Sequence, residues 1–490
     1  MLLLLRILLF LILLAVFLLL AALLRTLSIS PTAAKTAAPP PEDPRRARQY
    51  GEVLSAMLRM ETVSVKGQED FSKFAAFQES LRPLFPHIFS RCEIAHPGEG
   101  LLIRLPARGE PAGEPILLMS HHDVVPAQAE DWRHGAFSGD IDADGVVWGR
   151  GAVDTKGALF CELQALEELI AAGWQPEKDV YIASGCTEEW GGPGAQATVQ
   201  WLQARGVRLG MLLDEGGMIL PDPISGVQGR YCMVGALEKG SGNVRLVARG
   251  KGGHASTPPR NSPLVRLGRL MDDLERHSPF RAELTPVIRE MFGRLAPNAD
   301  FGFKYILTNL WLFGPLVRRL LPRLVPLAGS MLQTTCAFTM AGGSEAANVL
   351  PTEAWVTANL RFCPHQDDQA SLRALRQRAE RFDVEVQVLS AEKPCPPVDV
   401  HGAPFRLLEE TAAHIYPGYD VVPYAMTANT DARFFTGICD HCLRFAPIEI
   451  TQAQYASIHS VNECLNTAAL PPAVDFYKQL LQDYCARTDL

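Results

Sequence analysis

The hydrophobic positions of the chain form one long apolar run, followed by shorter, patterned runs. Residues 7–24 are eighteen consecutive apolar residues, flanked by Arg6 and Arg25. A helix of this length measures about 27 Å, close to the thickness of the hydrocarbon core of a bilayer. The run is longer than the apolar region of a usual signal peptide, and no A-x-A cleavage site follows it. We therefore expect residues 1–25 to be a retained signal anchor, with a cleaved signal peptide as the alternative.

Residues 26–44 contain five prolines and several Ala and Thr residues, a composition typical of an extended linker. Either form of the apolar segment exports the rest of the chain, so we expect a membrane-anchored or secreted protein with its folded part outside the cytoplasm. The flanking charges do not fix the orientation of the segment, because Arg6 and the amino terminus compete with Arg25 and Lys35.

Short apolar runs alternate with helical stretches in residues 45–238 and again in residues 393–490. This alternation predicts an α/β fold, with a central mixed sheet of buried strands flanked by helices. Three of the runs, at 116–119, 180–183 and 211–213, end abruptly in polar residues. Because reactive groups collect at the carboxyl ends of strands in open α/β sheets, we expect the functional site at this edge.

Residues 239–392 have a different pattern, which predicts an inserted ferredoxin-like α+β lid domain between the two parts of the α/β domain. The expected elements are strands at 243–248, 354–362 and 384–389 and helices at 262–276 and 371–381. An extra segment at 280–330 includes a basic and apolar run at 316–327. This segment could line an acyl pocket, rest on a membrane surface, take the place of a partner's lid, or simply pack on the lid core.

Composition and charge narrow the functional classes. The chain has 490 residues, of which 47% are hydrophobic and 20% charged, as in a globular protein. Its net charge of −8 argues against a nucleic-acid-binding protein, which would carry a basic stripe. Eleven cysteines without regular spacing exclude a disulfide scaffold, and the lone C-x-x-C of Cys439 and Cys442 favours packing over metal binding.

Two histidines and three carboxylates stand at strand ends, in glycine-rich turns or near the end of the chain: His121, Asp154, Glu189, Asp214 and His459. Imidazole nitrogens and carboxylate oxygens suit zinc and similar divalent ions. With one bridging carboxylate, the five residues would make two three-ligand sites, as in two-metal hydrolases. Glu188 would then be free to move protons. Taken alone, Asp154 would be read as a helix-capping residue.

Five motifs, in this order, resemble the signatures of the dizinc carboxypeptidase and aminoacylase family of metallopeptidases: S-H-H-D-V-V-P, W-G-R-G-A-V-D-T-K-G, T-E-E-W-G-G, D-E-G-G and H-S-V-N-E. The chain looks most like the carboxypeptidase S and N-acyl-amino-acid hydrolase branch. The resemblance implies that one of two zinc ions is held by His121, Asp154 and Asp214. The other would be held by Asp154, Glu189 and His459. It also implies that Asp123 orients His121, that Glu188 is the general base and acid, and that the Asp154–Thr155 peptide is a candidate cis bond.

The lid carries two further matches to this family, G-K-G-G-H-A-S at 250–256 and N-V-L-P at 348–351. The resemblance implies that His254 donates to the developing oxyanion, often from a partner subunit, so a homodimer through the lid is one expected arrangement. Asn348 and Arg361 would hold the free carboxylate of the substrate, for which the parallel donors of a guanidinium are well suited.

Together these features predict a metal-dependent hydrolase that cleaves the amide bond of an N-acyl amino acid or short peptide next to a free carboxylate. Water held at the metals would attack, with Glu188 as general base. Two alternatives stay open: an aminopeptidase with a similar dizinc core, and a catalytically inert binding protein. The inserted lid argues against the first, and the intact ligand set against the second. The sequence leaves open the acyl chain, the preferred amino acid and the native metal.

Overall fold

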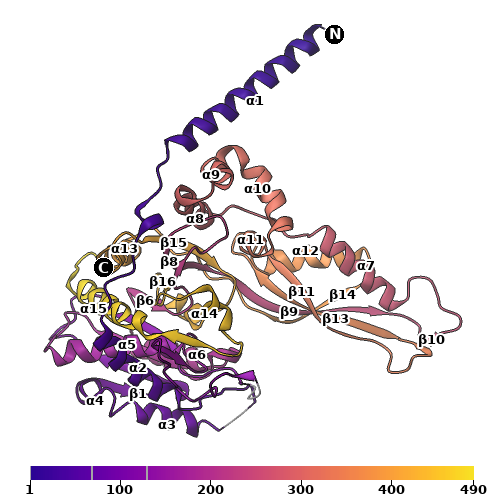
Figure 1. Ribbon diagram of the computed structural model, residues 1–490. Helices are drawn as coiled ribbons and strands as arrows, with labels where there is room; N and C mark the ends of the chain where they lie inside the picture. The colour runs from indigo at the N-terminus through magenta and orange to yellow at the C-terminus, as the bar shows by residue number, and fades with distance from the viewer. Residues whose placement is uncertain (1, 68–69, 128–130) are drawn as a thin grey trace.

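The computed structural model describes residues 2–67, 70–127 and 131–490. The described residues form two main sheets and a long N-terminal helix, α1 (Leu2–Ser28), that projects away from them (Figure 1). The apolar run at 7–24 lies within α1, and most of its side chains are exposed. Among the described residues, α1 is the one helix long and apolar enough to cross a membrane.

The larger sheet has nine strands among the described residues, in the order β1-β2-β5-β3-β6-β16-β8-β15, with β7 also paired to β8. β5, β3, β6 and β16 run parallel to one another, whereas β1, β2 and β7 pair antiparallel with their neighbours. The sheet is therefore mixed, as predicted. Its strands are β1 (Glu93–Ala95), β2 (Leu101–Leu105), β3 (Ile116–His121), β5 (Val180–Gly185), β6 (Met211–Asp214), β7 (Ile219–Pro221), β8 (Arg230–Glu238), β15 (Asp420–Met426) and β16 (Cys442–Arg444).

Helices cover both faces of this sheet, which explains the continuous apolar runs of its central strands. In β3, Ile116 and Leu118 point into one core, and Leu117 and Met119 into the other. The first core is shared with α2 (Pro44–Leu58), α5 (Lys156–Ala171), α13 (Ala403–Ile415) and α15 (Leu470–Ala486), and the second with α6 (Gly194–Gln203). The shorter helices are α3 (Ser72–Ser80), α4 (Pro86–Arg91) and α14 (Gln452–Ser457).

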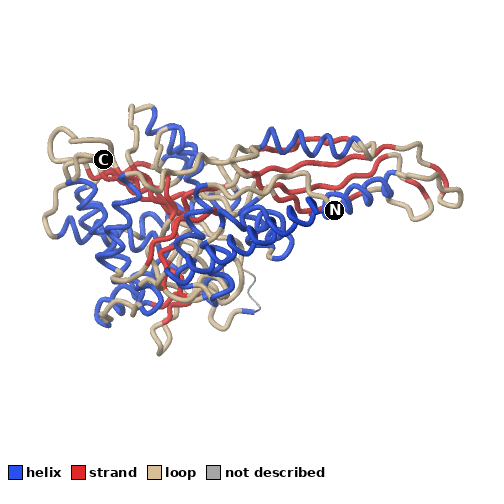
Figure 2. Tube along the Cα trace, turned by 90° about the horizontal axis from the view of Figure 1, so that it is seen from above, coloured by secondary structure: helices blue, strands red, loops and turns tan. Residues whose placement is uncertain are grey.

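The second sheet has the antiparallel order β11-β13-β9-β14 and extends from the first as an arm (Figure 2). Its chain order is β9 (Gly240–Arg249), α7 (Pro263–Arg276), β11 (Thr335–Gly342), β13 (Glu353–Phe362), α12 (Asp368–Glu380) and β14 (Glu385–Ala391), a ferredoxin-like arrangement. The sequence pattern did not predict β11. Its side chains are half-buried or exposed, so it lacks the alternation that marks a strand with one buried face.

The segment at 280–330 forms α8 (Pro286–Leu295), α9 (Phe301–Thr308), α10 (Leu310–Leu324) and most of α11 (Pro326–Leu332). The sequence assigned this segment to the lid, but α8 packs on the core of the larger sheet through Val287, Ile288, Met291 and Phe292. The helical spacing of these residues predicts a buried face, and it cannot say which of two cores will bury it.

Candidate active site

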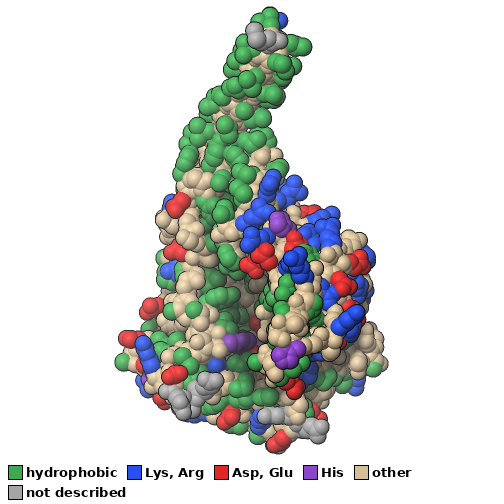
Figure 3. Space-filling view, turned by 90° about the vertical axis from the view of Figure 1, so that its right-hand side faces the viewer, with side chains coloured by type: hydrophobic (Ala, Val, Ile, Leu, Met, Phe, Trp, Pro, Cys, Tyr) green, Lys and Arg blue, Asp and Glu red, His purple; other side chains and the backbone are tan. Residues whose placement is uncertain are grey.

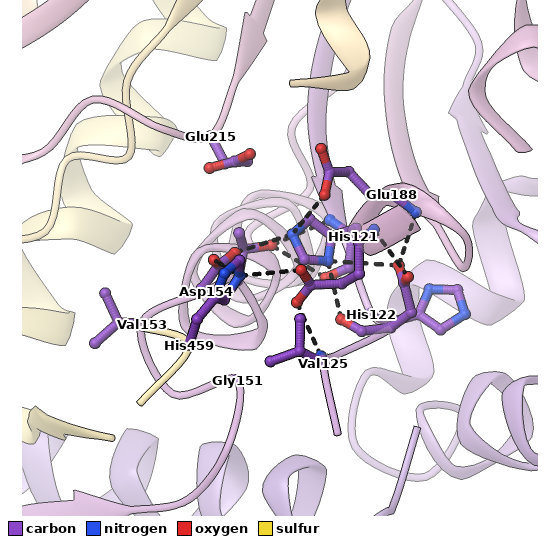
Figure 4. Close-up of polar contacts among 12 residues, drawn as sticks. His121, His122, Val125, Gly151, Val153, Asp154, Glu188, Glu215 and His459 are labelled. Carbon is purple, nitrogen blue, oxygen red and sulfur yellow. Dashed lines mark hydrogen bonds and ion pairs between the residues drawn. The ribbon is translucent and has the colours of Figure 1, made fainter. Parts of the chain in front are cut away.

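Polar side chains from three strands meet at one edge of the larger sheet (Figure 4). His121 ends β3, Asp214 ends β6, and Glu188 and Glu189 lie in a short 3-10 turn after β5. β3 pairs in parallel with both β5 and β6, so the three carboxyl ends are neighbours. The edge at which the sequence placed the functional site is therefore the edge where these groups gather.

Two loops bring Asp154 and His459 to the same edge. Asp154 lies in the turn before α5, and its peptide bond to Thr155 is cis. His459 follows α14 with a left-handed backbone, at a φ of 58°. β4 (Val146–Trp148), which precedes the turn of Asp154, pairs antiparallel with β17 (Cys464–Asn466), which follows the loop of His459. This pairing holds the two segments together.

Asp154 lies between the two histidines. Its Oδ1 is 3.0 Å from Nε2 of His121, and its Oδ2 is 3.1 Å from Nε2 of His459. Nε2 of His459 also lies 3.0 Å from Oε2 of Glu189, and these contacts to Asp154 and Glu189 raise the pKa of His459 to about 10. Ligand atoms of His121, Asp154 and Glu189 all lie within 4.8 Å of one another. A carboxylate whose two oxygens face different imidazoles fits a residue that bridges two metal ions.

The site holds more buried carboxyl groups than its histidines can balance. Burial raises the pKa of Glu188 and of Glu215 well above the usual range. It also raises the pKa of Asp214 to about 6 and that of Asp431 to about 7. Because buried negative charge without a counter-ion is unfavourable, this donor set fits divalent cations.

Asp214 lies next to this cluster with a different set of contacts. Its Oδ1 accepts a hydrogen bond from the Glu215 N–H at 2.9 Å, and its Oδ2 accepts one from the Ala432 N–H at 2.8 Å. Among the described residues, the group with ligand atoms within 4.8 Å of one another does not include Asp214. The structure thus brings four of the five sequence candidates into direct contact: His121, Asp154, Glu189 and His459.

Asp123 is fully buried and contacts both His121 and the turn after β5. Nδ1 of His121 lies 2.9 Å from the backbone carbonyl oxygen of Asp123 and 3.5 Å from its carboxylate Oδ1. The carboxylate accepts hydrogen bonds from the N–H groups of Glu188 and Glu189, both at 3.2 Å. The closer partner of the imidazole is therefore the carbonyl, while the carboxylate fixes the turn that carries the two glutamates.

Glu463 is a site residue to which the sequence analysis gave no role. It is fully buried and accepts hydrogen bonds from the N–H groups of Gly151, Val153 and Asp154 at 2.9 to 3.0 Å. It also accepts one from Nη1 of Arg150 at 2.9 Å. Glu463 therefore fixes the turn that presents Asp154. The one sequence signal was its place at the end of the H-S-V-N-E motif.

A cavity of about 260 Å³ opens beside the cluster. Asp154, Glu188, Glu189, Glu215 and His459 contribute to its polar side. Its apolar or aromatic lining comes from Met218, Tyr424, Met426, Tyr455 and Ile458. A cavity lined by both carboxylates and apolar side chains suits a small substrate that has an apolar part.

The structure places the three lid candidates differently. His254 and Asn348 are exposed near the outer end of the second sheet, where β10 (Gly253–His254) pairs with β12 (Val349–Leu350) (Figure 1). There, Nδ1 of His254 lies 2.7 Å from Oγ of Ser256. Arg361, near the end of β13, donates instead to the side chain of Asn429, which lines the cavity. A single chain therefore brings Arg361 towards the site and leaves His254 and Asn348 apart from it.

Comparison with known proteins identifies the family of the chain. The chain belongs to peptidase family M20/M25/M40, whose profile matches residues 117–483. It is 32% identical over 475 residues to the N-fatty-acyl-amino acid synthase/hydrolase PM20D1 of Homo sapiens, covering 93% of this chain and 94% of that protein. The family resemblance inferred from the motifs is thereby confirmed.

Two solved structures share the fold. The M20 family metallo-carboxypeptidase Sso-CP2 from Sulfolobus solfataricus aligns with a TM-score of 0.65 at 17% identity, over 90% of this chain and all of that one. The YXEP protein of Bacillus subtilis, described as a dinuclear metal-binding peptidase of the M20 family, aligns with a TM-score of 0.55 at 13% identity, over 90% and 99% of the two chains. The predicted α/β class with a mixed sheet is therefore confirmed.

Proposed function

We propose that this protein is a metal-dependent hydrolase that cleaves the amide bond of an N-acyl amino acid or short peptide next to a free carboxylate. The observation that carries the proposal is the position of Asp154 between His121 and His459, with Glu188 at the same strand edge. Membership of the M20 family and the N-fatty-acyl-amino acid synthase/hydrolase relative support the same class of reaction.

We propose two zinc ions as the cofactors. His121, Asp154 and Asp214 would hold one ion, and Asp154, Glu189 and His459 the other. The imidazole and carboxylate donors fit zinc, and the surplus of buried carboxylates fits the charge of two dications. When bound, the ions supply the Lewis acidity that polarises the substrate carbonyl and acidifies water.

Glu188 is positioned to move the proton. Its Oε2 lies 3.9 Å from Nε2 of His121, so its carboxylate faces the proposed metal ligands and the cavity. Asp123 fixes the backbone N–H of Glu188 and leaves its carboxylate free for this task. Glu188 would accept a proton from the attacking water and return it to the leaving amine.

The cavity walls support the proposed substrate class. The guanidinium of Arg361, next to Asn429, is suited to bind the free carboxylate of the amino acid. The apolar side chains of Met218, Met426 and Ile458 would contact the acyl group. In this arrangement the scissile amide would lie between the two groups, next to the carboxylates that line the cavity.

We propose that the outer end of the second sheet serves a second copy of the chain. His254 and Asn348 are exposed there, and within one chain they do not contribute to the cavity. In a homodimer through the lid, His254 would donate to the developing oxyanion in the partner's site.

We propose that α1 anchors the protein in a membrane, with the catalytic domain outside the cytoplasm. Only 6% of the most apolar 18-residue window of α1 is buried within the protein. Exposure of such an apolar helix to water is unfavourable, whereas the same helix is stable in a bilayer.

The test compares wild type with Glu188→Gln, both purified at full length in detergent and loaded with zinc. The substrates are matched fatty-acyl amino acids, acetyl amino acids and dipeptides, and metal content is measured alongside. We expect zinc-dependent release of the amino acid, lowered about 10²- to 10⁴-fold in Glu188→Gln with metal content unchanged. Glu353→Gln is the control, because Glu353 pairs with Arg249 on the exposed surface of the second sheet.

The substrate panel also distinguishes between two classes of substrate. Preference for long acyl chains would identify an N-acyl-amino-acid hydrolase, and preference for dipeptides a carboxypeptidase. Equal rates for wild type and Glu188→Gln, both with two bound metals, would contradict the proposed mechanism.

A further inference from the structure

Helix α10 presents an apolar face to solvent. Leu316, Leu320 and Leu324 recur every four residues along one face of the helix, and their side chains are 53%, 38% and 71% exposed. Gly314 and Val317 are the buried residues of this helix. A helix of a soluble domain normally buries its leucine stripe. Because this stripe is exposed in the folded chain, we expect it to contact an apolar partner outside the chain.

The exposed apolar surface extends beyond α10 to its neighbours. Phe301 in α9, Trp311 at the start of α10 and Leu327 in α11 are 57%, 50% and 62% exposed. We call these three residues, together with the leucine stripe of α10, the α9–α11 surface. None of them is among the residues that line the cavity beside the carboxylate cluster. The surface therefore does not form the wall of that cavity.

The charge around this surface has one sign. The sequence contains no Asp or Glu between Asp300 and Glu345. Arg318, Arg319 and Arg323 in α10 are exposed, and among the residues described by the structure none forms an ion pair with them. An apolar stripe flanked by unpaired arginines is the pattern of a helix that lies in the interface of a membrane with anionic lipids.

Polar contacts fix this surface to the C-terminal end of α1. Nδ2 of Asn309 donates to the carbonyl oxygen of Ala22 at 3.1 Å and to Oγ1 of Thr26 at 2.9 Å, and both polar side chains are fully buried. The hydroxyl of Tyr305 donates to the carbonyl oxygen of Leu19 at 2.9 Å. The start of α10 and the end of α9 therefore lie against the last turns of the apolar helix.

These contacts place the surface at the level of a membrane boundary. Leu19 lies within the apolar run of α1, six residues or about 9 Å along the helix before Arg25. A bilayer spanned by this run has its boundary along the same turns that α9 contacts. Figure 3 shows hydrophobic side chains covering α1 and continuing onto the body below it.

We infer that the α9–α11 surface is a second membrane contact, which lies in the interface of the same bilayer that α1 spans. Its leucines would enter the boundary between headgroups and acyl chains, and its arginines would bind anionic headgroups. The inference rests on the proposed anchoring by α1 and is independent of the proposed hydrolase activity. A body held at two places has a fixed orientation relative to the bilayer, whereas a single helix with a flexible linker would leave it free.

The test places a tryptophan on the surface and measures its depth in lipid. Leu324→Trp is introduced into the full-length chain, which is reconstituted into vesicles of phosphatidylcholine and phosphatidylglycerol with or without bromine on the acyl chains. The control is Leu264→Trp, at a position of α7 that is 51% exposed and lies on the second sheet. We expect bromine to remove about half of the emission added at position 324, because an interfacial helix lies ~5–10 Å into the headgroup and acyl boundary. Emission added at position 264 should be unchanged.

Each other outcome overturns the inference. If the protein floats with the vesicles but the emission at 324 resists bromine, α1 anchors the chain and the surface stays out of the lipid. If the protein does not float with them, the anchor is wrong as well. Emission at 324 that depends on protein concentration and not on bromine would assign the surface to a second copy of the chain.

A charge variant tests the role of the arginines in the same background. Arg318→Gln, Arg319→Gln and Arg323→Gln are combined with Leu324→Trp. We expect them to weaken quenching in vesicles with phosphatidylglycerol and to leave it unchanged in pure phosphatidylcholine. Equal weakening in both lipids would show that anionic headgroups are not bound by these residues.

Discussion

The Glu463→Gln substitution tests how the fold presents Asp154, the residue that we propose bridges two metal ions. Oε1 of Glu463 accepts from the N–H groups of Val153 and Asp154, and Oε2 accepts from the N–H of Gly151 and from Nη1 of Arg150. A glutamine side chain has the same shape but only one acceptor oxygen. In either orientation of the amide, its NH₂ group takes the place of one carboxylate oxygen. The two donors that faced that oxygen then have no acceptor.

The expected cost follows from these contacts. A hydrogen bond to a charged group contributes about 1.5–3 kcal/mol, so the loss of two corresponds to about 3–6 kcal/mol. We expect the free energy of unfolding to fall by about 4 kcal/mol, because Arg150 also loses its buried ionic partner. Displacement of Asp154 by about 1 Å would lower kcat/KM roughly 10²-fold.

Urea unfolding and hydrolysis are measured on full-length wild type, Glu463→Gln and Glu162→Gln. Glu162 is an equally buried carboxyl that accepts one side-chain hydrogen bond, from Ser120 at 2.9 Å, and burial raises its pKa well above the usual range. Because burial disfavours its charged form, the uncharged glutamine side chain should replace it at a cost of about 1 kcal/mol or less. The reasoning is refuted if the two variants unfold at the same urea concentration and hydrolyse substrate at the same rate.

Three further predictions concern other buried charges. Asp154→Asn should bind less zinc than wild type when metal is measured after gel filtration, and retention of two ions would contradict a bridging role. Arg444→Met removes the fully buried partner of Glu238 at 2.8 Å and should cost about 3–5 kcal/mol in urea unfolding, part of it regained in Arg444→Met/Glu238→Gln. Burial lowers the pKa of Lys239 from 10.5 to about 8, so between these values the lysine binds a proton in the unfolded chain that it lacks in the folded chain, and its own contribution to stability should rise with pH by about 3 kcal/mol. The free energy of unfolding of wild type should therefore rise by this amount relative to that of Lys239→Met, and a difference that does not change with pH would contradict the prediction.

Several features of the protein were determined by local sequence. Each buried strand of the larger sheet is a short apolar run, and the polar residues of each proposed metal-binding motif follow a strand or a turn directly. The site edge, the α/β class and the candidates His121, Asp154 and His459 could therefore be predicted without coordinates. The apolar run of α1 likewise predicts its own helix, because length and hydrophobicity suffice.

Other features depend on contacts between residues that are far apart in the chain, and only the tertiary structure decided them. Glu463 acquires its role from a turn more than 300 residues earlier, and no local pattern marks that partner. The apolar face of α8 could have packed on either core, and β11 has too little burial to show alternation. The leucine stripe of α10 likewise looks like an ordinary core face in the sequence. Its exposure beside the last turns of α1 is a property of the folded chain, because burial is decided by which elements meet in space.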